Sequence, residues 1–249
     1  MAPQIRGQIG NQIRGQIRNQ IGQKNSVNGK NGQPAFAQIT DFRYNMAMST
    51  YQLTHSIALI GLMGAGKSAV GRQLAQIIGC GFMDADTEIE TEAGLSIAEI
   101  FELGGEAKFR DIEQRVIARL LDSPPMILST GGGAFCQPET QALIQAHATS
   151  LWLYAPPETL LGRMSNPANR PLLRVADPAQ VMRDLNEKRA PFYQQAKIKV
   201  DTDHCSLPQA VERVKRALMA HGVLAQDDGQ EDSQDDGSTA TLPLDTGAV

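Results

Sequence analysis

Cysteine, tryptophan and long hydrophobic runs are all scarce in this sequence of 249 residues. Its three cysteines, Cys80, Cys136 and Cys205, show no CxxC spacing, which argues against a zinc site and a disulfide framework. No apolar run approaches the ~18 residues that a membrane-spanning helix needs. We therefore expect a soluble protein of a reducing compartment, with neither a membrane nor a nucleic acid as its partner.

Charge is unevenly distributed between the two ends of the chain. Residues 1–50 carry six Lys/Arg and one acid, whereas residues 226–249 carry seven acids and no base. Five tandem tetrapeptides of the type QIRG begin at Gln4, and a four-residue period drifts by ~40° per repeat around a helix. We predict disordered tails at 1–50 and 226–249 around a domain at 51–225. Plastid import through the first tail is the minority interpretation.

Short apolar strands alternate with helical segments in the middle of the chain. The pattern predicts strands at 56–60, 82–83, 126–128, 151–154 and 198–200. It predicts helices over 70–78, 97–104 and 109–120, and two more that begin near 178 and 207. This alternation indicates an α/β fold, with a parallel sheet covered on both faces and ligands at the carboxyl ends of its strands.

A phosphate-binding loop follows the first predicted strand. The stretch GLMGAGKS at 61–68 matches GxxxxGK[ST] and lies between a strand and a helix. Gly64 and Gly66 allow backbone N–H groups to turn toward a phosphate chain, and Lys67 reaches its β/γ-phosphates. The Ser68 hydroxyl is the expected Mg²⁺ ligand. The motif predicts ATP or GTP binding without naming the acceptor of the γ-phosphate.

Two aspartates, Asp84 and Asp86, follow the second predicted strand. A strand period of two would place both carboxylates on the same side. The chain lacks an NKxD stretch for guanine and a strand of four apolar residues ending in Asp. Asp84 is therefore expected to support the metal beside Ser68, and Asp86 to face a second ligand. A GTPase is disfavoured, and a small-molecule kinase is favoured.

The chain resembles the shikimate kinases over roughly residues 55–205. The matching stretches, in order, are GLMGAGKSAVGR, FMDADTEIE, SIAEIFELGGEAKFRDIE, LSTGGGA, RMSNPANRPLL and KRAPFY. The resemblance implies a three-layer P-loop kinase fold, with a five-stranded parallel sheet, a mobile lid and a substrate-binding helical segment. It implies transfer of the ATP γ-phosphate to the 3-hydroxyl of shikimate, with Mg²⁺ as cofactor, in aromatic amino-acid biosynthesis. We expect a cytoplasmic monomer whose partners are ATP and shikimate.

The same resemblance assigns roles to individual residues. It implies that Arg110 and Arg189 bind the shikimate carboxylate and that Asp86 accepts hydrogen bonds from ring hydroxyls. Gly131, Gly132 and Gly133 would offer backbone groups to the ring. The implied nucleotide-binding residues are Gly64, Ala65, Gly66, Lys67, Ser68, Ala69, Arg163 on adenine and Arg170 of the lid on the transferring phosphoryl group. Catalysis would rest on Lys67, Asp86 and Arg170, and the metal on Ser68 and Asp84.

Each of these roles has a simpler alternative. Asp86 is a candidate cap for the following helix, Arg110 is a candidate partner of Glu113 or Gln114 along its own helix, and the three glycines are candidates for a plain turn. Arg163 and Arg170 are candidates for exposed loop residues. Ala69 departs from the family, where a second hydroxyl is common, which predicts modestly weaker nucleotide binding. A gluconate kinase and an inactive kinase-like binding protein are the alternative functions.

Overall fold

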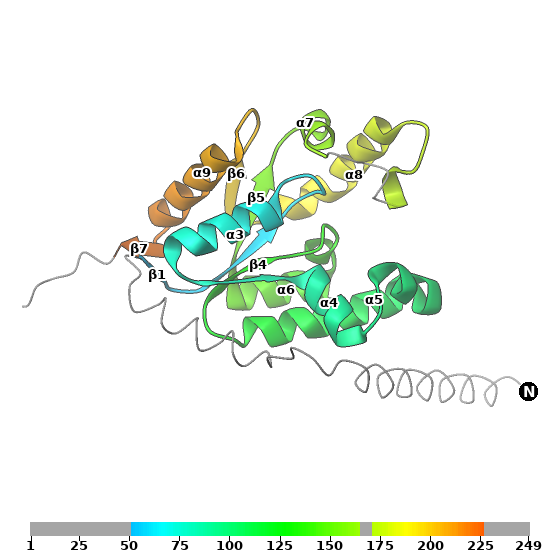
Figure 1. Ribbon diagram of the computed structural model, residues 1–249, viewed down its shortest axis with the longest axis horizontal. Helices are drawn as coiled ribbons and strands as arrows, with labels where there is room; N and C mark the ends of the chain where they lie inside the picture. Colours follow the sequence, from blue (N-terminus) through cyan, green and yellow to red (C-terminus); the bar gives the residue numbers. More distant parts are fainter. Residues whose placement is uncertain (1–50, 165–170, 227–249) are drawn as a thin grey trace, which may run out of the picture.

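The computed structural model describes residues 51–164 and 171–226 of the chain (Figure 1). Its strands are β1 (Tyr51–Leu53), β2 (Ser56–Ile60), β3 (Gly81–Asp84), β4 (Met126–Ser129), β5 (Ala148–Tyr154), β6 (Ile198–Asp201) and β7 (Leu224–Gln226). Its α-helices are α3 (Lys67–Ile78), α4 (Ala85–Ala93), α5 (Ile97–Leu121), α6 (Pro138–His147), α7 (Pro157–Gly162), α8 (Pro178–Tyr193) and α9 (Leu207–Ala220). Short 3-10 helices occupy Ala134–Cys136 (η1) and Pro171–Leu173 (η3).

Five parallel strands form the central sheet in the order β3-β4-β2-β5-β6. The central strand β2 pairs with β4 from Ile57 opposite Ile127, and with β5 from Ser56 opposite Ala148. All five strands predicted from apolar runs are present, so the α/β fold and the five-stranded parallel sheet are confirmed. The carboxyl ends of β2, β3 and β4 lie next to one another because the three strands are neighbours in parallel register.

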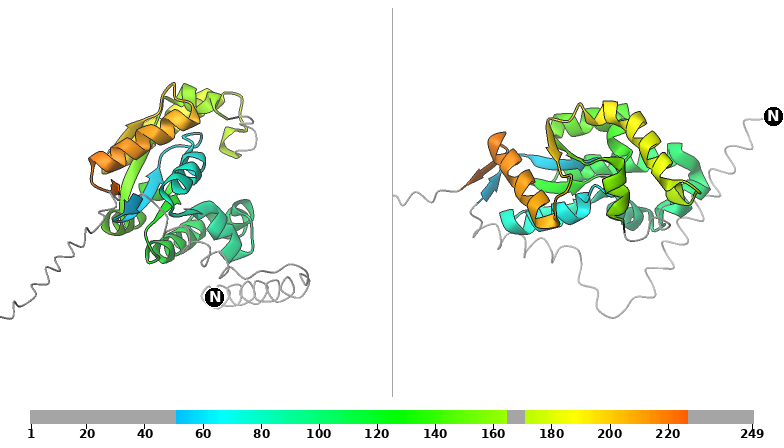
Figure 2. Two further views of the ribbon diagram at one scale, coloured as in Figure 1. Left: turned by 60° about the vertical axis from the view of Figure 1, so that its left-hand side comes forward. Right: turned by 90° about the horizontal axis from the view of Figure 1, so that it is seen from above.

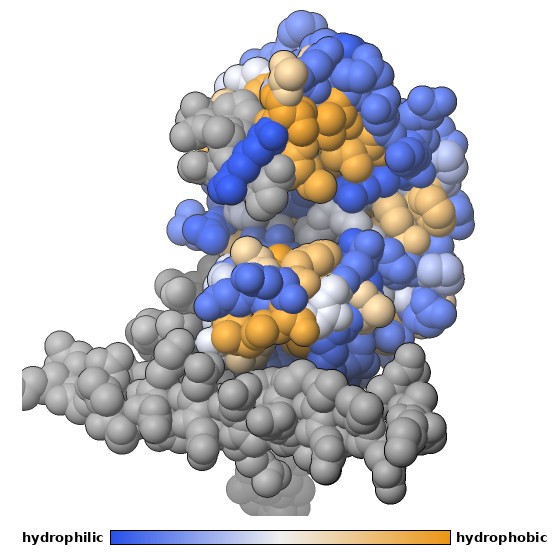
Figure 3. All heavy atoms as spheres, turned by 90° about the vertical axis from the view of Figure 1, so that its right-hand side faces the viewer, coloured by the Kyte–Doolittle hydropathy of each residue, from blue (hydrophilic) through white to orange (hydrophobic). Residues whose placement is uncertain are grey.

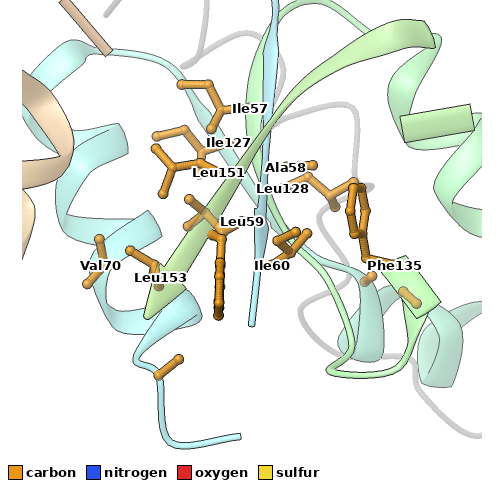
Figure 4. Packing of buried hydrophobic residues seen from close by; sticks show 14 of the residues in the cluster. Ile57, Ala58, Leu59, Ile60, Val70, Ile127, Leu128, Phe135, Leu151 and Leu153 are labelled. Carbon is orange, nitrogen blue, oxygen red and sulfur yellow. The ribbon is translucent and has the colours of Figure 1, made fainter. Parts of the chain in front are cut away.

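The hydrophobic core lies on both faces of the sheet (Figure 4). Every residue of β2 is buried, as expected for an inner strand of a parallel sheet. Its side chains alternate in direction: Leu59 points to the side of Val70 on α3, and Ile60 points to the side of Phe135 in η1. This packing fixes the end of β2, and therefore the loop that leaves it, against both helix layers.

Helices cover both faces of the sheet, which gives three layers. α3 and α9 pack against each other on one face, and Figures 1 and 2 show them side by side. α6 packs against β5 and α5 on the other face, and α8 packs against η1 and α7. None of the helices in the described ranges is both long and apolar enough to cross a membrane.

Two features of the fold were not predicted from the sequence. Helices α6 and α7 each begin with a proline in the first turn. The strands β1 and β7 form a separate antiparallel pair, with Tyr51 opposite Gln226, at one end of the molecule (Figure 2). These two strands are only partly buried and lack the continuous apolar run that marked the strands of the central sheet.

The segment labelled α5 consists of two helices that meet at a kink, as the sequence predicted. Ser96 caps its first residue in a capping box with Glu99, as the SIAE stretch predicted. Gly105 breaks the helical geometry with φ 67° and ψ −175°. The two predicted helices are therefore the two halves of α5, and the second half carries Arg110.

Candidate active site

The P-loop connects β2 to α3 and surrounds the mouth of a cavity of about 640 Å³. α3 begins at Lys67, and its N-cap residue Gly66 makes no side-chain cap hydrogen bond. The first backbone N–H groups of α3 are therefore open to an anion in the cavity. The ammonium group of Lys67 donates to the carbonyl oxygens of Gly61 and Leu62 at 2.9 and 3.1 Å, so it lies over the loop.

Close packing requires glycine at one position of this loop. Gly64 has φ +80°, and a Cβ there would lie 2.5 Å from the carbonyl oxygen of Leu160 in α7. A side chain is excluded by both the backbone conformation and the neighbouring helix. The P-loop thus sits directly against α7, the helix that precedes Arg163.

Three oxygen-bearing side chains meet beside the P-loop. The Ser68 hydroxyl donates to Asp84 Oδ2 at 2.5 Å and lies 3.2 Å from the Ser129 hydroxyl. Ser129 pairs with Asp84 across β3 and β4. Hydroxyl and carboxylate oxygens beside a phosphate site are ligands that suit Mg²⁺, which retains several waters and takes few protein ligands. The two predicted metal ligands are therefore adjacent, and Ser129 was not foreseen.

The two aspartates do not share a strand face, and that prediction was wrong. β3 ends at Asp84, whose side chain caps α4 by accepting a hydrogen bond from the Asp86 N–H at 3.2 Å. Asp86 already belongs to the first turn of α4. The cap is therefore Asp84 rather than Asp86, and the change from strand to helix directs the two carboxylates differently. Both still line the cavity.

Arg110 is held by two carboxylates on its own helix. Its guanidinium contacts Glu113 at 2.7 Å and Glu106 at 3.1 Å. The pairing with Glu113 that was considered as an alternative is therefore present. Glu113 is fully buried, and its Oε1 has no hydrogen-bond partner among the described residues. Burial raises the pKa of the Glu113 carboxyl, and the charge of Arg110 opposes that rise.

The segment Gly131–Gly133 lies between two arginines. A Cβ at Gly133 would be 2.5 Å from Arg110 Nη2, and a Cβ at Gly132 would be 3.2 Å from Arg189 Nη1. A Cβ at Gly131 would be 2.8 Å from Glu113 Oε1 and 3.0 Å from Asp86 Oδ1. The glycines are therefore more than a plain turn, since side chains at these positions would displace four predicted or buried polar groups.

We call the group formed by Gly131–Gly133, Arg110 of α5 and Arg189 of α8 the acceptor side, after its predicted role. It opens between α5 and α8. Figure 3, which faces these helices, shows two apolar areas separated by a hydrophilic hollow. The exposed large apolar side chains of this region are Phe101 and Leu103 in α5, and Leu172 and Val175 before α8.

Arg163 closes the opposite end of the cavity. Its guanidinium donates to the Thr202 hydroxyl at 3.1 Å and to the Thr202 carbonyl oxygen. Thr202 is fully buried and bonds the carbonyl oxygen of Tyr154 in β5 through both its N–H and its hydroxyl. Arg163 therefore lines the cavity together with Cys205 and its neighbours, although its side chain is mostly exposed. Thr202 was not foreseen because only the folded structure brings it to Arg163.

Several predictions lie outside the described residues. These concern Arg170, the lid from Ser165 onward, of which only Pro171 is described, and the two tails, of which only Gln226 is described. Most of the other predicted residues line the cavity, including the P-loop residues, both aspartates, Gly132 and Arg163. Arg110, Arg189, Gly131 and Gly133 do not line it and lie beside it, next to or against the glycine segment. All three cysteines are free thiols, and the four histidines are exposed.

Comparison with known proteins identifies the family. The shikimate kinase family model matches residues 63–219, which is more than half of the chain. The chain belongs to the shikimate kinase family. A shikimate kinase of Caulobacter vibrioides is 53% identical over 163 residues, which cover 66% of this chain and 82% of that protein. One of Ruegeria pomeroyi is 50% identical over 167 residues, which cover 67% and 86%.

A solved shikimate kinase has the same fold. The structure of the Acinetobacter baumannii enzyme in complex with shikimate matches with a TM-score of 0.64 and 34% identity. The match covers 72% of this chain and 98% of that one. The family match favours the shikimate kinases over the gluconate kinases. The matched residues include the P-loop from Met63 as well as Arg110 and Arg189.

Proposed function

We propose that this chain transfers the γ-phosphoryl group of ATP to the 3-hydroxyl of shikimate, giving shikimate 3-phosphate and ADP. One observation carries the proposal beyond family membership: the glycine segment between Arg110 and Arg189 touches the P-loop. A Cβ at Gly132 would lie 3.5 Å from the Gly61 carbonyl oxygen and 3.8 Å from the Met63 nitrogen. An acceptor whose carboxylate binds both arginines would therefore lie beside the phosphate site.

The nucleotide is assigned to the P-loop side of the cavity. Its phosphate chain would bind the open N–H groups of α3 and Lys67, while Gly64, Ala65 and Ala69 shape the loop around it. Arg163 would pack on adenine. Ser68 and Asp84 would hold Mg²⁺, which neutralises charge on the phosphate oxygens when bound. Ala69 presents no hydroxyl, and modestly weaker nucleotide binding is expected from it.

The acceptor is assigned to the other side. Arg110 and Arg189 would bind its carboxylate with their planar guanidinium groups. Asp86 would accept the proton of the 3-hydroxyl as that oxygen attacks the γ-phosphorus. Lys67, and Arg170 of the lid, would place positive charge where the transferring phosphoryl group accumulates negative charge. Phosphoryl transfer needs such positioning and charge neutralisation rather than a covalent intermediate on the protein.

The oligomeric state, the cellular location and the activity of the chain can be proposed from its site residues and its relatives. All proposed site residues belong to one chain, which supports a monomer. The relatives named above come from bacteria, which contain no plastids, and this supports the bacterial cytoplasm as its location. Retention of Lys67, Asp84 and the acceptor-side arginines argues against an inactive binding protein, since loss of catalysis would release the constraint on these side chains.

An assay of ADP release tests the function directly. Purified protein with Mg²⁺-ATP is supplied with shikimate or with gluconate, and the product is identified by mass spectrometry. We expect shikimate-dependent ADP release in equal amount to shikimate 3-phosphate, and none above background in a Lys67→Met control. Turnover with gluconate and none with shikimate would overturn the proposal.

A further inference from the structure

Tyr193 is the last residue of α8 and one of the largest fully buried side chains of the described chain, at 1% exposed. Its hydroxyl donates a hydrogen bond to the carbonyl oxygen of Gly132, 61 residues away in sequence. Its ring lies 5.7 Å from the Trp152 ring, in a tilted arrangement. The phenol is therefore held by packing and aimed at the acceptor-side glycines.

The three glycine carbonyl groups differ in how they are held. Gly131 O accepts from the Ala134 N–H and Gly133 O accepts from the Cys136 N–H, each at 3.1 Å. Both of these hydrogen bonds are local to the turn that leads into η1. The partner of Gly132 O comes instead from another element, α8. Tyr193 therefore supplies the only one of the three contacts that depends on the position of α8.

The orientation of this carbonyl determines where a neighbouring N–H points. The peptide unit that joins Gly132 to Gly133 is planar and trans, so its C=O and N–H point in opposite directions. No residue in the described ranges accepts a hydrogen bond from the Gly133 N–H. The Arg110 guanidinium lies against Gly133. Fixing Gly132 O thus fixes a donor beside an arginine that binds the acceptor.

The same helix also carries the second acceptor-side arginine. Arg189 and Tyr193 are four residues apart on α8, and so they share one face of the helix. Burial raises the pKa of the Tyr193 hydroxyl, and the positive charge of Arg189 opposes that rise. The phenol keeps its proton at neutral pH, as donation to a carbonyl oxygen requires.

We propose that Tyr193 is a positioning residue for the acceptor, whose hydroxyl orients the Gly132–Gly133 peptide so that the Gly133 N–H faces the acceptor carboxylate. The inference rests on the proposed function, because it concerns how shikimate is bound. Tyr193 acts through the glycine backbone and through its contact with Arg189, and it does not touch the reacting atoms.

The test removes one oxygen atom with Tyr193→Phe in the full chain. Loss of the hydrogen bond frees the peptide, and we expect the KM and the calorimetric dissociation constant for shikimate to rise about tenfold. The kcat and the KM for ATP should stay within about twofold, since the P-loop is untouched. Tyr154→Phe is the matched control, because the ring centroid of Tyr154 also lies close to that of Trp152, at 5.2 Å. We expect no change in the KM for shikimate or for ATP in this variant.

The outcomes separate the inference from the function on which it rests. An unchanged shikimate KM in Tyr193→Phe, with active wild-type enzyme, overturns the inference and leaves the function intact. Equal rises in both KM values, together with a lower melting temperature, also overturn it, because they indicate a purely structural role. A wild-type chain that binds ATP but does not phosphorylate shikimate overturns the proposed function itself.

Discussion

A single buried carboxylate, Glu113, holds the guanidinium of Arg110 in place. Glu113 is fully buried, and its contact with Arg110 fixes the guanidinium against Gly133. An isolated buried carboxylate is unfavourable unless it is paired. Its retention in an otherwise apolar helix face is consistent with a role in orienting Arg110 toward an anionic acceptor. The KFRDIE stretch contains both residues, yet only the structure shows that Glu113 faces inward.

Replacement of Arg110 should therefore damage the acceptor site selectively. Arg110→Ala removes a charge-assisted bidentate contact, and we expect the KM for shikimate to rise about 10- to 100-fold. The KM for ATP should change by less than about twofold, because the P-loop is formed by other elements. Arg115→Ala, on the same helix but in an exposed pair with Asp111, is the control and should behave as wild type. Equal effects of Arg110→Ala on both KM values would remove Arg110 from the acceptor site.

Cys80 illustrates a residue whose chemistry is suppressed by burial. Partial burial against the core raises the pKa of its thiol from 9.0 to about 12. The thiolate is the reactive form of cysteine, and at pH 8 its fraction falls tenfold for each unit by which the pKa rises. Native Cys80 should therefore react with iodoacetamide at pH 8 at least ~100-fold more slowly than Cys80 of the protein unfolded in urea. Peptide mass spectrometry after timed alkylation measures both rates. Similar rates in native and unfolded protein would show that Cys80 is accessible.

At the scale of elements, the sequence predicts what depends on local periodicity. The five central strands, α3 with its left-handed Gly79 cap, and the capping box of α5 follow from local patterns. The relation between Asp84 and Asp86 does not, because the strand ends at Asp84, which caps the next helix, and Asp86 already lies in that helix. Element boundaries depend on such competition between capping and strand pairing, which composition alone does not resolve.

Contacts between elements are the second kind of feature that the sequence does not predict. Ser129, Thr202 and Tyr193 act on residues that lie 39 to 61 positions away in sequence. Nothing in the local pattern of a Thr or a buried Tyr indicates its partner. The predicted site residues were found because they fall in the P-loop motif or in stretches that match the family, whereas the residues that support them come from packing.

The glycine segment between β4 and η1 gives a prediction at this scale. A methyl group at position 133 would lie 2.5 Å from Arg110 Nη2, so Gly133→Ala should displace the guanidinium and raise the KM for shikimate about tenfold or more. Gly162→Ala is the control, since a Cβ there has no neighbour within 4 Å. Steady-state kinetics of both variants checks this. A Gly133→Ala enzyme with wild-type KM values would show that the segment does not approach the acceptor.

At the scale of the whole molecule, the P-loop from Met63 and the arginines Arg110, Arg163 and Arg189 all lie within the residues that the family model matches. The described proposed site residues lie between Gly64 and Arg189, and the family match also leaves out residues 1–50. We therefore expect deletion of residues 1–50 to leave kcat/KM for both substrates within about twofold of the full chain. The ADP-release assay on both proteins measures this. A large loss of activity would give those residues a part in the site.

The central claim is that the two aspartates act on different ligands in the cavity. Asp84 holds the metal beside the nucleotide, and Asp86 binds the acceptor hydroxyl. Asp84→Asn and Asp86→Asn test it most directly, because asparagine preserves the helix cap at 84 and nearly preserves the shape at 86. The measurement is the dissociation constant of Mg²⁺-ATP by calorimetry alongside kcat with shikimate. The account predicts that Asp86→Asn lowers kcat by about 10²- to 10⁴-fold with Mg²⁺-ATP binding unchanged, whereas Asp84→Asn weakens Mg²⁺-ATP binding. Full activity of Asp86→Asn, or equal loss of Mg²⁺-ATP binding in both variants, would contradict it.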